Sequence, residues 1–77
     1  MERTKVKSSN IVSIGWENEV LEVEFSSGAV YSYFKVPERR FKDLMANESK
    51  GKFFASQVKP HFQSMLKPKL VILPSAS

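Results

Sequence analysis

The stretch of sequence that decides the fold is VLEVEFSSGAVYSYF, residues 20–34. Residues 21–25 alternate between apolar and acidic side chains, a pattern typical of a half-buried β-strand. Ser26, Ser27 and Gly28 then predict a turn, because glycine adopts positive φ at little steric cost. The residues after the turn are again β-branched or aromatic, so the stretch predicts an antiparallel β-hairpin.

A two-residue turn at Ser27-Gly28 would fix which side chains share a face of this hairpin. It places Phe25 opposite Val30 and Glu24 opposite Tyr31. One face is then apolar and comprises Leu21, Val23, Phe25, Val30 and Phe34. The other face carries Glu22, Glu24, Tyr31 and Tyr33, with the two tyrosine rings about 7 Å apart along the strand.

A strand before the hairpin completes a three-stranded antiparallel meander. Residues 10–16 are rich in β-branched and aromatic side chains, and Glu17-Asn18 provides a polar turn into the hairpin. This turn predicts an apolar face that includes Val12, Ile14 and Trp16, and a tyrosine face that includes Ile11 and Ser13. Residues 1–8 are polar and basic, and we expect them to form a flexible N-terminal tail.

A first helix is expected directly after the sheet. Pro37 suits the start of a helix over residues 38–46, since its missing N–H would have no partner there. Phe41, Leu44 and Met45 form an apolar stripe at helical spacing. Because the sheet has one apolar face, this stripe predicts a helix packed on that face.

A second helix is predicted from Lys50 to about Lys59, with Ser49 as its N-cap and Pro60 at its limit. The predicted fold class is therefore α+β, in the order β-β-β-α-α, with both helices on one face of the sheet. An apolar run near the C-terminus predicts an extra edge strand, a contact with a partner chain or a disordered segment. It comprises Leu70, Val71, Ile72 and Leu73.

Size and composition indicate one small domain without a membrane span. The chain has 77 residues and no cysteine, so disulfides and thiolate metal sites are excluded. No apolar run approaches the roughly 18–20 residues of a membrane-spanning helix. The first residues lack the apolar region of a signal peptide. We therefore expect a cytoplasmic protein of bacterial or phage origin.

The charge distribution points to a polyanion as one candidate partner. The net charge is +4, but residues 1–34 carry −2 and residues 35–77 carry +6. Clustered lysine and arginine attract phosphates, and tyrosine rings stack on unpaired bases. The candidate nucleic-acid-binding residues are Arg39, Arg40, Lys42, Lys50, Lys52, Lys59, Tyr31 and Tyr33. The alternative reading is a solvated basic surface, with tyrosine rings that only shield the sheet.

The order of these motifs resembles the KTSC domain, named for the C-terminus of some lysyl-tRNA synthetases and also found as a small bacterial protein. The resemblance rests on the Tyr31-Ser32-Tyr33 motif and on the later Ser49-Lys50-Gly51 segment followed by an aromatic residue. It covers residues 9–62 and leaves 63–77 as a C-terminal extension. The family implies no established activity, although RNA binding has been suggested for it. Trp16 and Val58-Lys59 are mild departures from its pattern.

Catalytic patterns are weak in this sequence. His61 is the only histidine, and no carboxylates stand near it at the spacing of metal ligands. The segment Ser49-Lys50-Gly51-Lys52 lacks the preceding glycine of a phosphate loop. We therefore expect a binding module without catalytic activity, cofactor or metal. The alternative function is protein–protein interaction, including self-association, through a sheet edge or through the apolar run at residues 70–73.

Overall fold

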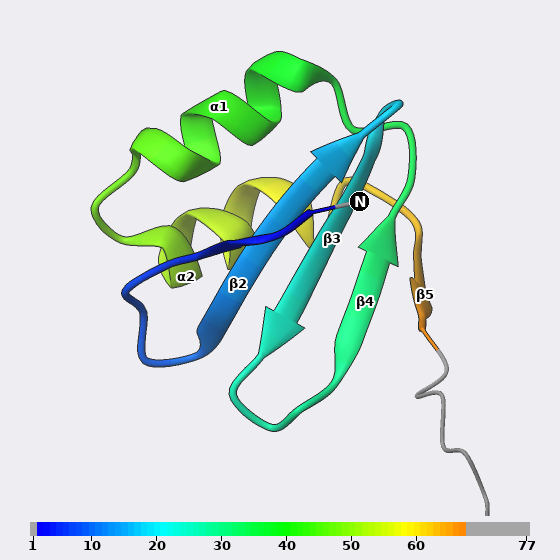
Figure 1. Cartoon of the computed structure of the whole chain (residues 1–77). Helices are drawn as coiled ribbons and strands as arrows, with labels where there is room; N and C mark the ends of the chain where they lie inside the picture. Colours follow the sequence, from blue (N-terminus) through cyan, green and yellow to red (C-terminus); the bar gives the residue numbers. More distant parts are fainter. Residues whose placement is uncertain (1, 68–77) are drawn as a thin grey trace, which may run out of the picture.

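The computed structural model describes residues 2–67, which form an antiparallel sheet with helices packed on one face (Figure 1). The sheet has five strands in the order β1-β2-β3-β4-β5. The elements are β1 (Thr4–Lys5), β2 (Ile11–Glu17), β3 (Val20–Phe25), β4 (Val30–Tyr33), α1 (Glu38–Ala46), α2 (Lys50–Phe53), the π-helix η1 (Phe54–Val58) and β5 (Ser64–Leu66). The α+β class is confirmed.

The predicted count of three strands is too low, because two short strands extend the central meander. β1 lies within the segment predicted to be a flexible tail, and Thr4 pairs with Ile14 of β2. β5 pairs with β4 and forms the opposite edge of the sheet. Strands of two and three residues are too short to show an alternating pattern in the sequence. The apolar run at residues 70–73 lies outside the described residues.

The predicted hairpin register is wrong by one residue. Gly28 has a φ of 96°, and Phe25 bonds to Ala29 across a loop of three residues. A three-residue loop ending in a left-handed glycine is a common hairpin connection. Leu21 therefore pairs with Tyr33, and Val23 pairs with Tyr31. Since a shift of one residue exchanges the faces, the tyrosines lie on the apolar face beneath the helices rather than beside Glu22 and Glu24.

The first turn and first strand also differ from the prediction. Asn18 and Glu19 have φ values of 52° and 65°, so the two-residue turn lies one position later than Glu17-Asn18. A β-bulge between Ile11 and Ser13 then turns Ile11 into the core and leaves Val12 37% exposed. Ile14 and Trp16 pair with Val23 and Leu21 and face the core, as predicted.

The first helix confirms its predicted bounds and its apolar stripe. Leu44 is fully buried, while Phe41 and Met45 pack against the core from its margin. Phe41 stacks on Trp16 with 6.0 Å between ring centroids, and the Trp16 indole donates to the Val36 carbonyl at 2.8 Å. These contacts fix α1 across the sheet.

The second helix starts at Lys50 as predicted, but two details differ. The side chain of Ser49 makes no capping bond; instead the Ser49 N–H donates to Asn47 Oδ1 at 2.9 Å. After one turn, α2 continues as the π-helix η1. The Lys59 N–H reaches back five residues to the Phe54 carbonyl at 2.9 Å. Single π-turns of this kind are rare in proteins, and those that do occur are often found at functional sites.

Candidate nucleic-acid interface

Four aromatic rings form a closed cluster between the hairpin and η1. Phe25, Tyr31, Tyr33 and Phe54 contact one another in a cycle, with ring centroids 5.1–6.4 Å apart. We call them the aromatic cluster. Tyr33 and Phe54 are each 4% exposed and form its floor, whereas Phe25 and Tyr31 are half-buried and form its rim. Burial raises the pKa of Tyr33 above its ordinary value of 10.0. Only the rim rings can meet a ligand.

Three adjoining hollows run from the aromatic cluster along α2. The hollow over the cluster has a volume of about 570 Å³ and shares Asn10, Phe25, Phe54 and Lys59 with the next, of about 260 Å³. That middle hollow shares Asn10, Gly51 and Ala55 with a third, of about 450 Å³. Each hollow shares lining residues with the next, and we call the three adjoining hollows together the basic groove.

The basic groove is lined by four lysines. Lys7, Lys50 and Lys52 line the hollow at the start of α2, and Lys59 lines the two hollows nearer the aromatic cluster. Glu48 is the one carboxylate among the described residues that line the three hollows. Lys50 is oriented by a hydrogen bond from its Nζ to the Asn47 carbonyl at 3.0 Å. The groove therefore carries a strongly positive potential.

The structure divides the predicted site residues into two groups. Lys50, Lys52, Lys59, Tyr31 and Tyr33 line the basic groove. The remaining three lie on α1 and line none of its three hollows; they are Arg39, Arg40 and Lys42.

Two of the three basic residues of α1, Arg40 and Lys42, have packing or a local partner of their own. Lys42 pairs with Glu38 one turn earlier at 3.8 Å, with both side chains exposed. The Arg40 Nε is buried without a hydrogen-bond partner among the described residues. The exposed Lys42–Glu38 pair contributes little to stability and partly cancels the positive charge of the helix. The prediction that the basic residues of both helices bind nucleic acid stays a prediction.

Several residues that line the basic groove are not among the candidate nucleic-acid-binding residues predicted from the sequence. Lys7 belongs to the segment predicted to be a tail, and Asn10 precedes β2. Phe25 is predicted to lie on the apolar face of the hairpin, opposite to the tyrosines. The three-residue loop places Phe25 and the tyrosines on the same face. Phe54 lies within the predicted second helix and is not among the predicted site residues. Gly28 is compatible with either loop length, so it does not by itself decide the register.

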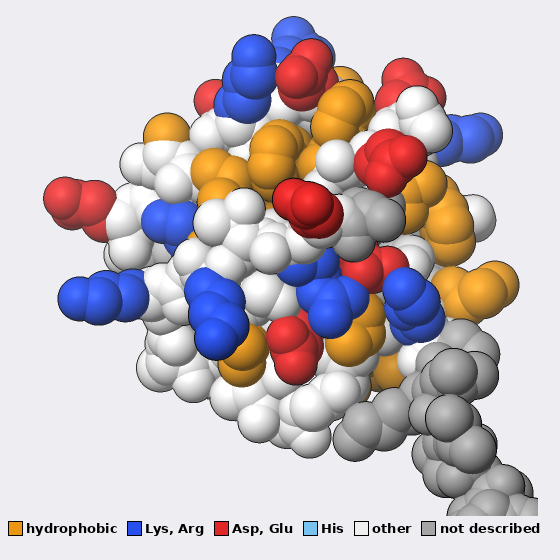
Figure 2. All heavy atoms as spheres, viewed as in Figure 1, with side chains coloured by type: hydrophobic (Ala, Val, Ile, Leu, Met, Phe, Trp, Pro, Cys, Tyr) orange, Lys and Arg blue, Asp and Glu red, His pale blue; other side chains and the backbone are white. Residues whose placement is uncertain are grey.

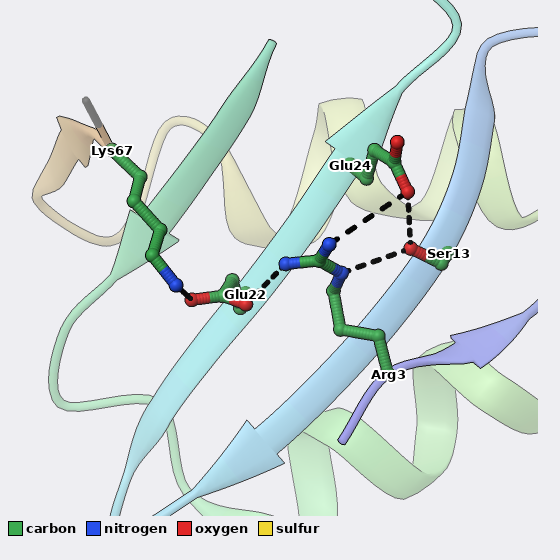
Figure 3. A network of polar contacts seen from close by, with 5 residues as sticks. All are labelled: Arg3, Ser13, Glu22, Glu24 and Lys67. Carbon is green, nitrogen blue, oxygen red and sulfur yellow. Dashed lines mark hydrogen bonds and ion pairs between the residues drawn. The ribbon is translucent and has the colours of Figure 1, made fainter. Parts of the chain in front are cut away.

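The opposite face of the sheet is occupied by a network of ion pairs around Glu22 (Figure 3). The Glu22 residue is 5% exposed and accepts hydrogen bonds from Arg3 and from Lys67, the latter at 2.9 Å. Arg3 also donates to Ser13 at 3.1 Å, and Ser13 donates to Glu24 at 2.8 Å. Figure 2 shows acidic and basic side chains interleaved on this face. Carboxylates among the cations make it a poor surface for phosphate.

Glu22 connects both edges of the sheet through a single carboxylate. Arg3 precedes β1 and Lys67 follows β5, so each partner reaches Glu22 from a different edge strand. Burial alone would raise the pKa of Glu22, but the hydrogen bonds and charges of Lys67 and Arg3 outweigh it and hold that pKa below its ordinary value of 4.5. The ionised carboxylate is therefore the form that the fold favours.

A lowered pKa predicts a specific loss of stability in acid. Because the pKa of Glu22 is lower in the folded chain, its contribution is complete above the unfolded-state pKa and is lost as pH falls through the folded-state pKa. We expect Glu22→Gln to lower the free energy of unfolding by about 1.5–3 kcal/mol near neutral pH. Urea unfolding at several pH values should show the two chains converging as the pH falls below the ordinary pKa of a glutamate side chain. A gap that stays constant with pH would contradict this assignment.

Neither a metal-binding cluster nor a membrane-spanning helix is found among the described residues. Between residues 2 and 67, no cluster of three or more His, Cys, Asp or Glu side chains is arranged to hold a metal ion. Within the same range, no helix is long and apolar enough to span a membrane.

Comparisons with known proteins agree on one family. The KTSC domain matches residues 7–62. A protein of Tsukamurella paurometabola is 40% identical over 62 residues, covering 78% of this chain and 92% of its own. The lysine–tRNA ligase of Nostoc punctiforme is 39% identical over 61 residues, which are 77% of this chain and 11% of the ligase.

A solved structure supports the same conclusion. The crystal structure of a KTSC domain protein from Yersinia pestis superimposes with a TM-score of 0.84 at 38% sequence identity. The match covers 87% of this chain and 97% of the Yersinia chain. The Yersinia chain therefore shares both the sequence pattern and the fold with this chain.

Proposed function

The chain belongs to the KTSC domain family, and from this premise we propose that it is a small non-catalytic module that binds single-stranded RNA in the basic groove. The bound strand would follow α2 and η1, from Lys7, Lys50 and Lys52 to Lys59 and the aromatic cluster.

The observation that carries the proposal is the composition of the basic groove. Among the described residues, four lysines and one carboxylate line its three hollows, and the hollow at one end contains two half-buried aromatic rings. Proteins that bind single strands combine a positively charged groove for the backbone with aromatic rings on which bases stack. On the helix-free face of the sheet, Glu22 and Glu24 neutralise the nearby cations, so this face is less suited to a phosphate backbone.

A relative adds independent support for RNA as the polyanion. A segment similar to most of this chain forms part of a lysine–tRNA ligase, whose name states tRNA as its substrate. A module joined to such an enzyme is well placed to contact RNA. For this chain, RNA binding is a proposal that rests on the groove.

The absence of catalysis is part of the proposal. His61 is exposed and lines a separate shallow hollow with Phe34, Lys35, Phe62 and Gln63. None of these neighbours is a carboxylate that could orient the imidazole as a general base. Cytoplasmic location, bacterial or phage origin and the boundaries at residues 8 and 62 also stay predictions.

The direct test is fluorescence anisotropy with a labelled single-stranded RNA over a salt series. If four lysines each neutralise one phosphate, the slope of log Kobs against log[salt] should be about −2.8. Affinity should then fall about 50-fold between about 50 and 200 mM salt. A probe that remains unbound at about 50 mM salt would remove the proposal, since electrostatic binding is strongest there.

The edge strand β5 favours a second candidate function, which is pairing with another protein. Its three residues are exposed at the edge of the sheet, and Met65 and Leu66 are 62% and 54% exposed. An exposed edge can accept a strand from a partner or from a second copy. The mass of the full chain and of the Met65→Lys variant, measured by light scattering, would show whether β5 pairs with a second copy. A monomeric full chain at high concentration would exclude self-association.

A further inference from the structure

We propose that the end of the basic groove over the aromatic cluster is a pocket for one unstacked RNA base, with the adjoining phosphate held by Lys59. This inference rests on the proposed function and deepens it, because it names the nucleotide contact that the groove would make. Tyr31 and Phe25 would contact the base, while Tyr33 and Phe54 would only support them.

The exposure of the four rings limits the pocket to a single base. Tyr33 and Phe54 are covered, so neither presents a face on which a base could stack. Tyr31 and Phe25 are half-buried, and their ring planes meet at 77° with centroids 5.8 Å apart. A planar base that lies flat on one ring therefore points its own edge at the face of the other. This corner fits one base and leaves no second parallel ring for its neighbour.

The floor of the pocket holds this corner in place before any ligand arrives. Tyr33 meets Phe54 at 85° and 5.1 Å, and Phe54 meets Phe25 at 64° and 5.4 Å. Phe54 is the first residue of η1, and the π-turn bond from Lys59 closes on its carbonyl. The π-turn therefore determines the positions of both the Phe54 ring and Lys59. Pre-ordered rings lose little conformational entropy when a base binds.

The chemistry around the rings matches a nucleotide. Among the described residues that line this hollow, none is a carboxylate, and Lys59 supplies the one cation. Four further side chains offer hydrogen-bond donors and acceptors that can meet the polar edges of a base; they are Asn10, Ser26, Ser27 and Ser64. The volume of about 570 Å³ lies within the range of small-molecule pockets.

The test compares two labelled probes of equal charge, an RNA of about six uridines and a ribose–phosphate oligomer of the same length without bases. We expect the full chain to bind the uridine probe about tenfold more tightly, which is the loss typical of one aromatic–base stack. Tyr31→Leu should remove this preference and leave the salt slope unchanged. Tyr31→Phe retains the ring and should retain the preference. Lys59→Gln should instead make the slope less negative by about 0.7.

Three results would overturn the inference, and they separate it from the proposed function. Equal binding of both probes would exclude a base pocket but leave the basic groove intact. No binding of either probe would remove the proposed function and the inference together. If Tyr31→Leu fails to fold, contacts between uracil and Tyr31 ring protons in NMR spectra of the unmodified chain decide the matter, and their absence would exclude the pocket.

Discussion

A chain in which Lys50, Lys52 and Lys59 are all replaced by Gln should bind single-stranded RNA about 500-fold more weakly at about 50 mM salt. One groove lysine, Lys7, then remains, so the slope of log Kobs against log[salt] should change from about −2.8 to about −0.7. The expected loss follows if the two lines meet near about 1 M salt, where the electrostatic contribution vanishes. Fluorescence anisotropy measures both the slope and the affinity.

The matched control changes the same amount of charge on α1. Replacing Arg39, Arg40 and Lys42 with Gln also removes three positive charges, but none of these residues lines the basic groove. At the same salt, screening weakens the effect of charges that do not contact the strand, so we expect a change within about threefold. If the α1 variant weakens binding as much as the groove variant, net charge rather than the groove accounts for the affinity.

The second large effect concerns stability, and it divides the tyrosine pair. Tyr33→Ala should lower the free energy of unfolding by about 3–5 kcal/mol, because it leaves a cavity beneath Phe54 in the core. A core of this size rarely supplies more than about that amount, so the variant should be largely unfolded. Guanidinium titration followed by Trp16 fluorescence measures the loss.

Tyr31→Ala is the matched comparison at the neighbouring position on the same face. Tyr31 is half-buried at the rim, so its truncation removes less buried area and should cost less than half as much stability. Equal losses for the two variants would contradict the separation of the aromatic cluster into a floor and a rim. A larger loss for Tyr31→Ala would reverse it.

The elements that the sequence predicted best are those that local chemistry determines. Pro37 and the stripe of Phe41, Leu44 and Met45 fixed the bounds and the buried side of α1 without help from the rest of the chain. The resemblance to the KTSC domain is likewise confirmed, since motif order is a property of the sequence. The first feature depends on residues close together in the chain, and the second on the order of short motifs along it.

The errors arose where one residue decides between two arrangements. Gly28 supports either a two-residue or a three-residue loop, and the choice moves Tyr31 and Tyr33 from one face of the sheet to the other. The bulge after Ile11 has the same effect on β2. Alternation alone cannot detect such insertions, because it describes the pattern within each strand and not the pairing between strands.

The candidate site was predictable in its charges but not in its shape. The excess of lysine and arginine after residue 34 identified Lys50, Lys52 and Lys59, and placed Arg39, Arg40 and Lys42 in the same set. Separating the two groups requires the hollows along α2, which depend on contacts from Asn10 and Phe25. Those contacts join segments far apart in the sequence.

The most direct test of RNA binding in the basic groove is a titration of the ¹⁵N-labelled chain with single-stranded RNA, followed by amide NMR spectra. We predict the largest shift changes at groove residues, among them Lys7, Asn10, Gly51 and Lys59, and small changes along α1 and at Glu22. Shift changes centred on Arg39 and Lys42, or on the helix-free face of the sheet, would contradict the account. So would spectra that do not change when the RNA is in large excess.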